Sequence, residues 1–326
     1  MPKGSSVPGA DSDAWKSPGG DGRVEWSGLE PNTEYDVYAR MKGSDTKEPS
    51  GPSPATTVKT PVVTVTNVVL NSEGAKKVYT KGEALDVTGL TLEVSRSDDS
   101  RQTVDVTADM VSGFEGSRIA EQTLSVTYEG FTRTYEIVVT KSLSDVPEDS
   151  WFHNVVSRAV GLGLFNGYDN GTFGPNDKVT RGQVAVVLWN MTGHPEPGTG
   201  GKEFSDVDAG KYYANAIGWA AQVGVVNGYG NGRFGPDDNV TREQLAVMVC
   251  NYAREVAGKE TTGSASDYAE MKDATNVSKW AVSSVGWCFQ NEIVSGTEDG
   301  YINPQGNATR AEAAKMLVYL HDLLRT

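Results

Sequence analysis

The sequence predicts a multidomain protein in which a β-rich N-terminal part precedes an array of three helix-loop-helix repeats. Within residues 23–141, apolar and polar side chains alternate as they do in half-buried strands. The last 183 residues hold three copies of one pattern, at 166–181, 227–242 and 295–310, each ending in Thr-Arg. The Thr-Arg pairs lie 61 and then 68 residues apart, so we expect tandem units, each a separate structural element.

Composition and charge exclude several classes of partner. The 326-residue chain has 37% apolar and 22% charged residues, which is ordinary for a globular protein. Its net charge of −14 argues against nucleic acid, because backbone phosphates require a basic surface. No apolar stretch approaches the roughly 18 to 20 residues of a membrane helix, so we expect no membrane insertion.

The N-terminal part is expected to begin with a flexible lead over residues 1–22, which are rich in Gly, Ser, Pro and Asp without a period. These residues lack the apolar core of a secretory signal. Because other features indicate a surface protein, we expect a longer precursor whose signal and first domains precede this sequence.

Residues 23–60 alternate as strands do at three places, namely 23–29, 33–41 and 55–60. The segment 29–35, Leu-Glu-Pro-Asn-Thr-Glu-Tyr, resembles the tyrosine corner of fibronectin type III domains. The resemblance covers only the last half of such a domain. We therefore expect a partial fibronectin-like region whose sheet has one unpaired face.

Residues 61–141 contain successive strand patterns and nothing helical; the strands are expected at 62–70, 90–94, 102–106, 122–128 and 134–140. The motifs at 78–90, 111–114 and 126–130 resemble the bacterial immunoglobulin-like domains of surface proteins. The resemblance implies a β-sandwich that serves as a spacer. Ligand binding by this unit stays an open alternative, although no cluster of aromatic or acidic residues favours it.

From Ser144 onward the apolar period becomes helical. In each repeat a first helix with an apolar stripe precedes a Gly-rich loop and a second helix with another stripe. We assign the repeats to 142–200, 201–260 and 261–326. The stripes of the first helices are expected to be Trp151, Val155, Val156, Ala159 and Val160, then Tyr212, Ala216, Ile217, Ala220 and Ala221, then Trp280, Ser284, Val285, Cys288 and Phe289.

Each second helix begins at the Thr-Arg pair. The third residue after the threonine is Gln or Glu, as a capping box requires. Capping explains the threonines, which are Thr180, Thr241 and Thr309. It does not explain the arginine, because a cation in the first turn opposes the helix dipole by roughly 0.3 to 1 kcal/mol.

Two explanations of the arginines stay open. An anion bound at the helix N-terminus would be favoured by free amides and by a bidentate guanidinium. The alternative is an intramolecular ion pair with an aspartate of the repeats. The arginines are Arg181, Arg242 and Arg310, and the aspartates are Asp145, Asp206 and Asp273.

The second repeat resembles the S-layer homology domain in the order of its segments, which are Phe204-Ser205-Asp206-Val207, a helix, the loop 227–236 and then 240–244. Residues 144–193 and 271–324 resemble the same domain. The resemblance implies an all-α, pseudo-threefold bundle with grooves between repeats. It also implies that the grooves bind secondary cell-wall polysaccharide, or another glycan linked to peptidoglycan, through the carboxylate of a pyruvate ketal. The protein would then lie outside the cell, on the bacterial cell wall or in its S-layer.

The resemblance also implies roles for single residues. Arg181, Arg242 and Arg310 would pair with the ligand carboxylate, and Thr180, Thr241 and Thr309 would shape the helix ends. Asp145, Asp206 and Asp273 would bind sugar hydroxyls or hold the arginines. Trp151, Trp280 and the equivalent Tyr212 would stack on sugar rings, and Gly167, Gly228 and Gly296 would let the backbone approach the ligand.

The third repeat departs from the other two. It alone carries the family's usual tetrad Thr-Arg-Ala-Glu, at 309–312, and it has Ser295-Gly296-Thr297 where the others have Asn-Gly-Tyr. We therefore do not expect the three grooves to bind equally.

We expect no metal, cofactor or catalytic site. The loop 169–177 superficially resembles a calcium loop, but Gly171 and Phe173 stand where oxygen ligands belong. Phe173, with its equivalents Phe234 and Ile302, is expected in the core. Cys250 and Cys288 fall at core helix positions, which favours buried thiols over a disulfide.

The sequence therefore predicts a non-enzymatic, noncovalent cell-wall anchor. Two alternatives stay open. The chain could be the anchoring part of a polysaccharide-degrading enzyme whose catalytic domain lies outside this sequence, or a structural subunit of the surface lattice that associates with itself. No G-x-S-x-G elbow or zinc motif supports catalysis by these residues.

Overall fold

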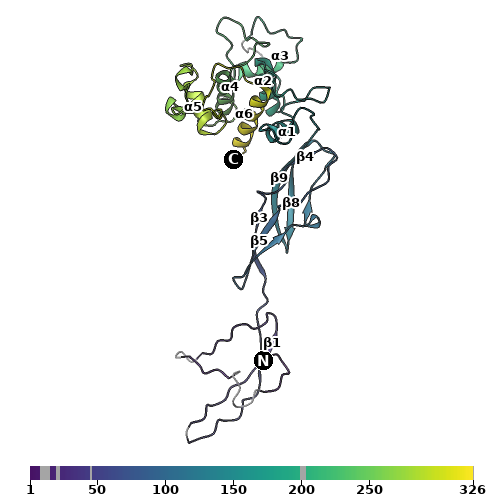
Figure 1. Ribbon diagram of the computed structural model, residues 1–326, viewed down its shortest axis with the longest axis vertical. Coiled ribbons are helices and arrows are strands. Elements are labelled where there is room, and N and C mark those ends of the chain that lie inside the picture. Colours follow the sequence, from purple (N-terminus) through teal and green to yellow (C-terminus); the bar gives the residue numbers. More distant parts are fainter. Residues whose placement is uncertain (8–14, 20–22, 45, 199–202, 326) are drawn as a thin grey trace. The chain divides into compact units, whose positions relative to one another are not determined.

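The computed structural model describes residues 1–7, 15–19, 23–44, 46–198 and 203–325 (Figure 1). The chain divides into two compact units, and each is described by itself. The first unit comprises Met1–Glu73, Leu90–Val106 and Thr127–Arg133, and the second comprises Gly74–Gly89, Thr107–Val126 and Thr134–Thr326. The predicted flexible lead falls partly outside the described residues.

The first unit is β-rich, as predicted. Strand β1 (Glu34–Val37) pairs antiparallel with β2 (Thr56–Lys59). A second antiparallel sheet has the order β3-β5-β6. Its strands are β3 (Val65–Asn71), β5 (Thr91–Arg96) and β6 (Arg101–Asp105). Alternate side chains of β5 are buried, because successive residues of a strand point to opposite faces.

The fibronectin-like segment has the hydrogen bond that the tyrosine corner requires. Tyr35 is buried, and its phenol oxygen accepts a hydrogen bond from the Glu30 amide at 2.8 Å. The predicted strand at 23–29 is wrong, since these residues form no strand. One edge of β1 pairs with β2 and residues 1–3 bond to the other, so β1 has no edge left for 23–29.

The sheet of the second unit has the order β4-β9-β8-β7. Its strands are β4 (Val78–Thr80), β7 (Val111–Ser112), β8 (Ala120–Tyr128) and β9 (Phe131–Thr140), and β4 runs parallel to β9. The strand-only prediction for this region is wrong in one detail, because Ala108–Met110 form a short 3-10 turn.

The helical part of the second unit contains two α-helices from each repeat, as predicted. The helices are α1 (His153–Gly161), α2 (Arg181–Met191), α3 (Ala214–Gln222), α4 (Arg242–Glu255), α5 (Val282–Gln290) and α6 (Arg310–Leu323). Two 3-10 turns, Ala265–Tyr268 and Ala274–Asn276, precede α5. Within the described ranges, every helix falls short of the length and apolar character that crossing a membrane requires.

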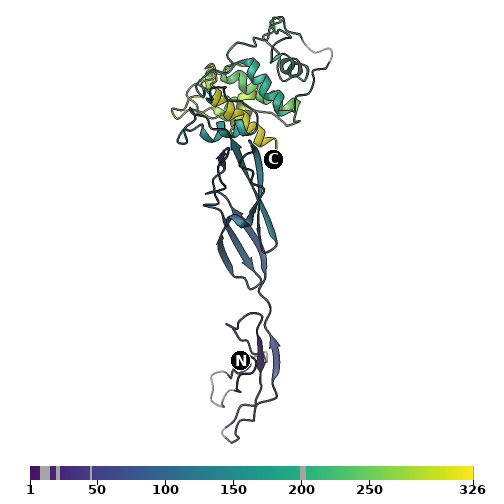
Figure 2. The same ribbon diagram turned by 90° about the vertical axis from the view of Figure 1, so that its right-hand side faces the viewer.

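The first helix of each repeat packs against the second helix of the preceding repeat. Helix α3 packs on α2, α5 packs on α4, and α1 closes the cycle by packing on α6. Figure 2 shows these helices gathered into one cluster. The expectation that each repeat is a separate structural element is therefore wrong, because each apolar stripe is covered by a neighbouring repeat.

The core of this cluster contains the side chains that the sequence placed there. Phe173, Phe234 and Ile302 are fully buried. Cys250 and Cys288 are buried and free, and burial raises the pKa of the Cys288 thiol. Phe173, Phe234 and Ile302 therefore occupy equivalent core positions in the three repeats.

The first-helix stripes are wrong at their first members. Trp151, Tyr212 and Trp280 precede the helices and expose 61%, 64% and 58% of their surface. The N-cap residues of the three helices are Phe152, Tyr213 and Ala281. Trp151, Tyr212 and Trp280 each stand one residue before the N-cap, so they do not follow the helical period.

All three second helices have the predicted capping box. In the first, the Thr180 hydroxyl oxygen accepts the Gln183 amide at 3.3 Å, and the Gln183 side chain accepts the Thr180 amide at 3.0 Å. Thr241 pairs with Gln244, and Thr309 with Glu312, in the same way.

Replacing Thr180 with alanine should lower the free energy of unfolding of the helical part by about 1 kcal/mol, because it removes the acceptor for one orphan amide. Thr180→Ser keeps that acceptor and should be nearly neutral. Urea unfolding followed by the helical circular dichroism signal measures both. Equal destabilisation by the two changes would show that the methyl group matters, not the cap.

Candidate functional site

Each arginine of the Thr-Arg pairs reaches into the loop of the next repeat. Its Nε donates a hydrogen bond to a loop carbonyl, and the third repeat bonds to the first. The three bonds run from Arg181 to Phe234 at 2.8 Å, from Arg242 to Ile302 at 2.7 Å and from Arg310 to Phe173 at 2.9 Å. The arginines therefore link the repeats in a closed cycle.

The backbone at the helix starts follows the same cycle. The amides of Arg181 and Gly182 donate to the carbonyls of Asp238 and Pro236 in the next repeat, at 3.0 and 2.9 Å. The other two helices make equivalent bonds. Beside them, Val179, Val240 and Ala308 form a ring of three backbone hydrogen bonds of 2.9 to 3.1 Å.

These bonds correct one sequence argument. One of the two open explanations relied on free amides at the helix N-terminus to help bind an anion, but the first two amides donate to loop carbonyls and the third to the capping threonine. The helix end therefore has no free amide for an anion, and only guanidinium donors could bind one.

The three predicted aspartates hold the loops that accept the arginines. Asp206 accepts the amides of Phe234 and Gly235 at 2.8 and 2.9 Å. Asp145 does the same for Phe173 and Gly174, and Asp273 for Ile302 and Asn303. In the part of the chain that the structure describes, none of them forms an ion pair with Arg181, Arg242 or Arg310, so the aspartate alternative is wrong.

The electrostatics of Asp206 follow from this geometry. Burial works to raise the pKa of its carboxyl, but the amides of Phe234 and Gly235 outweigh burial and hold the pKa below its ordinary value. Arg233 adds a charge at 3.3 Å. The ionised form is therefore the one that stabilises the loop.

Arg181 and Arg310 are buried without a counter-ion. They expose 6% and 5% of their surface, and among the described residues neither forms an ion pair. Burial lowers the pKa of both guanidinium groups. Aromatic faces partly compensate the charge, with Arg181 lying 4.6 Å from the ring centre of Tyr229 and Arg310 lying 4.9 Å from that of Tyr168. We call these places the Arg181 site and the Arg310 site.

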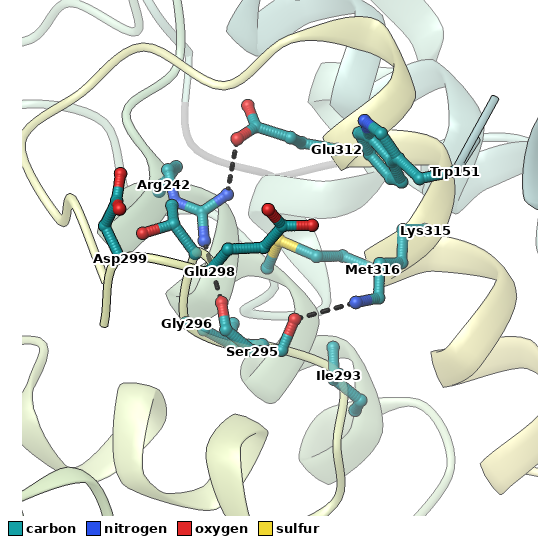
Figure 3. A pocket seen from close by; sticks show the side chains of 12 residues that line it. Trp151, Arg242, Ile293, Ser295, Gly296, Glu298, Asp299, Glu312, Lys315 and Met316 are labelled. Atoms are coloured by element: carbon teal, nitrogen blue, oxygen red, sulfur yellow. Dashed lines mark hydrogen bonds and ion pairs between the residues drawn. The ribbon is translucent and has the colours of Figure 1, made fainter. Parts of the chain in front are cut away.

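The Arg242 site differs, because Arg242 has a counter-ion. Its Nη1 donates to Glu312 Oε1 at 2.8 Å, and its Nη2 donates to the Ser295 carbonyl at 3.2 Å. A pocket of about 530 Å³ adjoins it (Figure 3). The pocket is lined by Trp151, Arg242, Ile293 to Asp299, Glu312, Lys315 and Met316.

Two of the exposed aromatic residues lie near an arginine of another repeat. Trp151 of the first repeat lines the Arg242 pocket. Burial, followed by the charge of Asp237, raises the pKa of the Tyr212 phenol, and the charge of Arg310 acts in the opposite direction because Tyr212 of the second repeat lies near it. The Arg242 and Arg310 sites thus draw residues from all three repeats.

The predicted glycines serve a contact within the protein. A Cβ on Gly228 would meet the Arg233 carbonyl oxygen at 2.5 Å and the Phe204 ring at 2.6 Å, and the residue has a φ of +70°. Gly167 and Gly296 are similarly crowded by Thr172 and Met271. The close backbone approach for which glycine is needed is to the repeat's own chain.

Four groups at these sites were not predicted from sequence: Tyr168, Tyr229, Glu312 as a counter-ion, and Lys315. An alignment of the three repeats could have pointed to them, because it shows where one repeat differs from the others. Thr297 stands at the position of Tyr168 and Tyr229, and Lys315 stands at the position of Val186 and Val247. Among the described residues, no group of His, Cys, Asp or Glu is arranged to hold a metal ion.

Comparison with known proteins agrees with this arrangement. The S-layer homology domain family matches residues 142–185, 203–246 and 270–314, and the group 3 bacterial Ig-like domain family matches 72–139. Both families are non-catalytic modules.

Three relatives illustrate the proteins to which the chain is similar. An amylopullulanase of Thermoanaerobacterium thermosulfurigenes is 27% identical over 78% of this chain and 14% of its own length. An S-layer protein of Bacillus thuringiensis subsp. finitimus is 27% identical over 54% of this chain and 21% of its own. A cellulosome-anchoring protein of Acetivibrio thermocellus is 25% identical over 51% of this chain and 38% of its own length. The chain thus spans well under half the length of these relatives.

The fold, the sites and these matches define a modular, cell-surface protein associated with the cell wall. The chain contains three S-layer homology domains, preceded by a bacterial Ig-like domain.

Replacing Asp206 with asparagine should cost about 1.5 to 3 kcal/mol, because a hydrogen bond to a charged acceptor is lost. The folded-state pKa of Asp206 is lowered, so its contribution is present above the ordinary value of 3.8 and is lost as the pH falls below that value. The free energy of unfolding of the wild-type protein should therefore fall more steeply below about pH 4 than that of Asp206→Asn. Parallel pH profiles for the two proteins would contradict this role of the carboxylate.

Proposed function

We propose that the three repeats anchor the protein noncovalently to the cell wall by binding an acidic wall polysaccharide. In this proposal the repeats form a pseudo-threefold bundle with one site at each interface between repeats. The cyclic hydrogen bonds of the arginines and the cyclic helix packing support the threefold arrangement. The similarity to a cellulosome-anchoring protein and to an S-layer protein supports the anchoring role.

The observation that carries the proposal is the pair of buried guanidinium groups without a counter-ion. A buried charge without an ion-pair partner is costly. Aromatic faces and the charges of Asp206 and Asp238 near Arg181, and of Asp145 and Asp177 near Arg310, offset part of this cost, and an incoming carboxylate would offset more. The Nε of Arg181 and of Arg310 is engaged by a carbonyl, and Nη2 of Arg310 also donates to the Asn166 carbonyl at 3.0 Å. The N–H groups of each guanidinium that these bonds do not use would bind the ligand. A sugar carrying a carboxylate, such as a pyruvate ketal, fits this chemistry.

The exposed aromatic residues provide the sugar-binding surfaces in this proposal. Pyranose rings present apolar C–H faces that pack on aromatic rings, while their hydroxyls bind polar groups at the edge. Trp151, Tyr212 and Trp280 stand at equivalent positions and are the large exposed side chains there. Thr180, Thr241 and Thr309, and also Asp145, Asp206 and Asp273, would position the sites without touching the ligand.

Several sites on one chain would make retention multivalent, so weak binding at each site could still hold the protein firmly. The Ig-like region 61–141 would act as a spacer, and we keep the predicted repeat boundaries 142–200, 201–260 and 261–326 as part of the proposal.

One alternative retains the anchoring role within a larger enzyme. The amylopullulanase bears an enzyme's name and aligns with this chain over 14% of its own length, so the matching region lies beside other regions in that protein. A structural lattice subunit is the other alternative, favoured by the S-layer relative. Sedimentation of the purified chain separates the two, because lattice subunits associate with themselves.

Retention on purified cell walls tests the function directly. The protein should sediment with intact walls, lose most binding after chemical removal of the secondary polysaccharide, and bind weakly when the carboxyl groups of that polysaccharide are reduced. Equal retention on all three preparations would exclude recognition of the polysaccharide.

Changing Arg181 and Arg310 together to alanine should weaken polysaccharide binding about 10- to 100-fold at each site, because charge-assisted hydrogen bonds contribute about 1.5 to 3 kcal/mol. Arg118→Ala is the matched control, since Arg118 is an exposed arginine outside the repeats. Helical circular dichroism verifies folding. Undiminished binding by the folded double variant would make both arginines purely structural.

Replacing Tyr212 with alanine should weaken binding about 2- to 10-fold, because stacking on an aromatic ring contributes roughly 0.5 to 1.5 kcal/mol. Tyr212→Trp installs the residue found in the first and third repeats and should bind as well as the wild type. Calorimetric titration with wall polysaccharide fragments measures both variants. If alanine and tryptophan bind alike, Tyr212 does not contact the sugar.

A further inference from the structure

Glu243 is a buried acidic residue outside the contacts of the three arginines. It follows Arg242 in the first turn of α4, and only 2% of its surface is exposed. Within the described part of the chain, no cation lies at ion-pair distance from its carboxylate. Hydrogen bonds must therefore stabilise the charge, because a buried carboxylate without partners is costly.

Three hydrogen bonds to the Glu243 carboxylate come from the third repeat. The Ser278 amide donates to Oε2 at 2.9 Å, and the Ser278 hydroxyl donates to Oε1 at 2.8 Å. The side-chain amide of Gln305 also donates to Oε1, at 2.8 Å. All three groups donate, as an ionised carboxylate requires. A helix of the second repeat thus holds the segment that leads into α5 of the third.

This segment is longer than its equivalents in the other repeats. Trp280 stands seven positions after the aspartate of its repeat, whereas Trp151 and Tyr212 stand six positions after theirs. The third repeat therefore needs a different turn before its exposed aromatic residue.

The shorter turns are held by bonds within their own repeat. The Ser150 amide donates to the Pro147 carbonyl, and the Lys211 amide donates to the Asp208 carbonyl, both at 3.1 Å. In the third repeat, Glu243 provides a support that comes from a neighbouring repeat.

The residue after each arginine decides whether such a contact can form. Gly182 and Ala311, at the positions equivalent to Glu243, have no side-chain acceptor. A Cβ on Gly182 would meet the Pro236 carbonyl oxygen at 2.8 Å and the Tyr213 ring at 3.2 Å, so a longer side chain has little room there. The carboxylate contact thus belongs to the interface between the second and third repeats.

The held segment carries Trp280. Ser278 lies two residues before it, and the Ser278 carbonyl accepts the Ala281 amide at 2.8 Å. The Trp280 side chain is 58% exposed, so packing fixes little of its position. The direction of this side chain therefore depends on the backbone that Glu243 holds.

The order of the repeats relates Trp280 to one arginine. Trp151 of the first repeat lines the Arg242 site, and Tyr212 of the second lies near Arg310. Each of these aromatic residues comes from the repeat after the one whose loop accepts the arginine. The same order gives Trp280 of the third repeat to the Arg181 site.

We propose that Glu243 is a positioning residue of the Arg181 site, which holds Trp280 where it can stack on a sugar ring of the ligand. Without Glu243, the longer turn would take several conformations, and binding would have to order it. This inference rests on the proposed function and adds to it a residue that does not touch the ligand.

Fluorine NMR of the full chain, labelled with fluorotryptophan, follows the two tryptophans separately. Trp280→Phe and Trp151→Phe assign the signals. The labelled protein is titrated with short fragments of purified secondary wall polysaccharide, and both signals of the wild type should shift.

Glu243→Ala should weaken the affinity measured at Trp280 about 5- to 30-fold, because the fragment must then order backbone that Glu243 held beforehand. The affinity measured at Trp151 should stay as in the wild type, since the bonds of the Arg242 guanidinium do not involve Glu243. Glu270→Ala, which removes an exposed glutamate of the third repeat, is the matched control and should change neither signal.

Ser278→Ala decides the question if Glu243→Ala does not fold. It removes one of the three donors and should weaken the affinity at Trp280 about 2- to 5-fold, again without an effect at Trp151.

Equal weakening at both tryptophans, or an unchanged affinity at Trp280 in the folded variant, would overturn the inference and leave the proposed function standing. So would a wild-type protein in which Trp151 responds and Trp280 does not. If neither tryptophan of the wild type responds to the fragments, the proposed function itself is wrong.

Discussion

The hydrogen bond from each arginine Nε to a loop carbonyl of the next repeat is the contact on which the helical part depends. A buried carbonyl needs a donor, and a buried guanidinium needs acceptors, so each group satisfies the other. The aspartate of the accepting repeat fixes the loop that presents the carbonyl, and the threonine caps the helix that carries the arginine. Because the third repeat bonds to the first, each repeat has a partner on both sides, in contrast to an open solenoid, whose terminal repeats need polar caps.

This contact also explains why a cation stands in the first turn of three helices. The cost of opposing the helix dipole is small beside that of leaving a buried carbonyl unpaired. The carbonyl uses Nε and orients the guanidinium plane, so the other nitrogen atoms can meet a second carbonyl, as at Arg242 and Arg310, the Glu312 carboxylate at Arg242, or the proposed ligand. Structural and binding roles of the arginine are therefore compatible, since they use different nitrogen atoms of one group.

Within the sites, the repeats share their backbone contacts and differ in the side chains beside the guanidinium groups. The backbone bonds, the capping boxes and the aspartate clamps are the same in all three copies. The residues beside the guanidinium vary in charge and size, as at Glu312, Lys315 and Thr297. Closure of the cycle constrains the backbone bonds, the capping boxes and the aspartate clamps, because a displacement at one interface between repeats also shifts the other two interfaces. The side chains beside the guanidinium groups can change without disturbing the fold, so each site can acquire its own ligand chemistry.

The sequence by itself determined the features that depend on neighbours along the chain. Helix starts at Thr180, Thr241 and Thr309 follow from a cap that spans three residues, and the burial of Phe173 follows from the alignment of the repeats. The prediction of a strand at 23–29 was wrong because the partners with which a strand pairs can lie far away along the sequence. Only the tertiary structure decided that helices pack across repeats, that the aspartates bind amides, and that Arg242 meets Glu312, 70 residues away. Capping hydrogen bonds and apolar periodicity depend on residues within a short segment, so the sequence shows them directly. Contacts between repeats depend on how the helices pack, which joins residues that are far apart in the sequence.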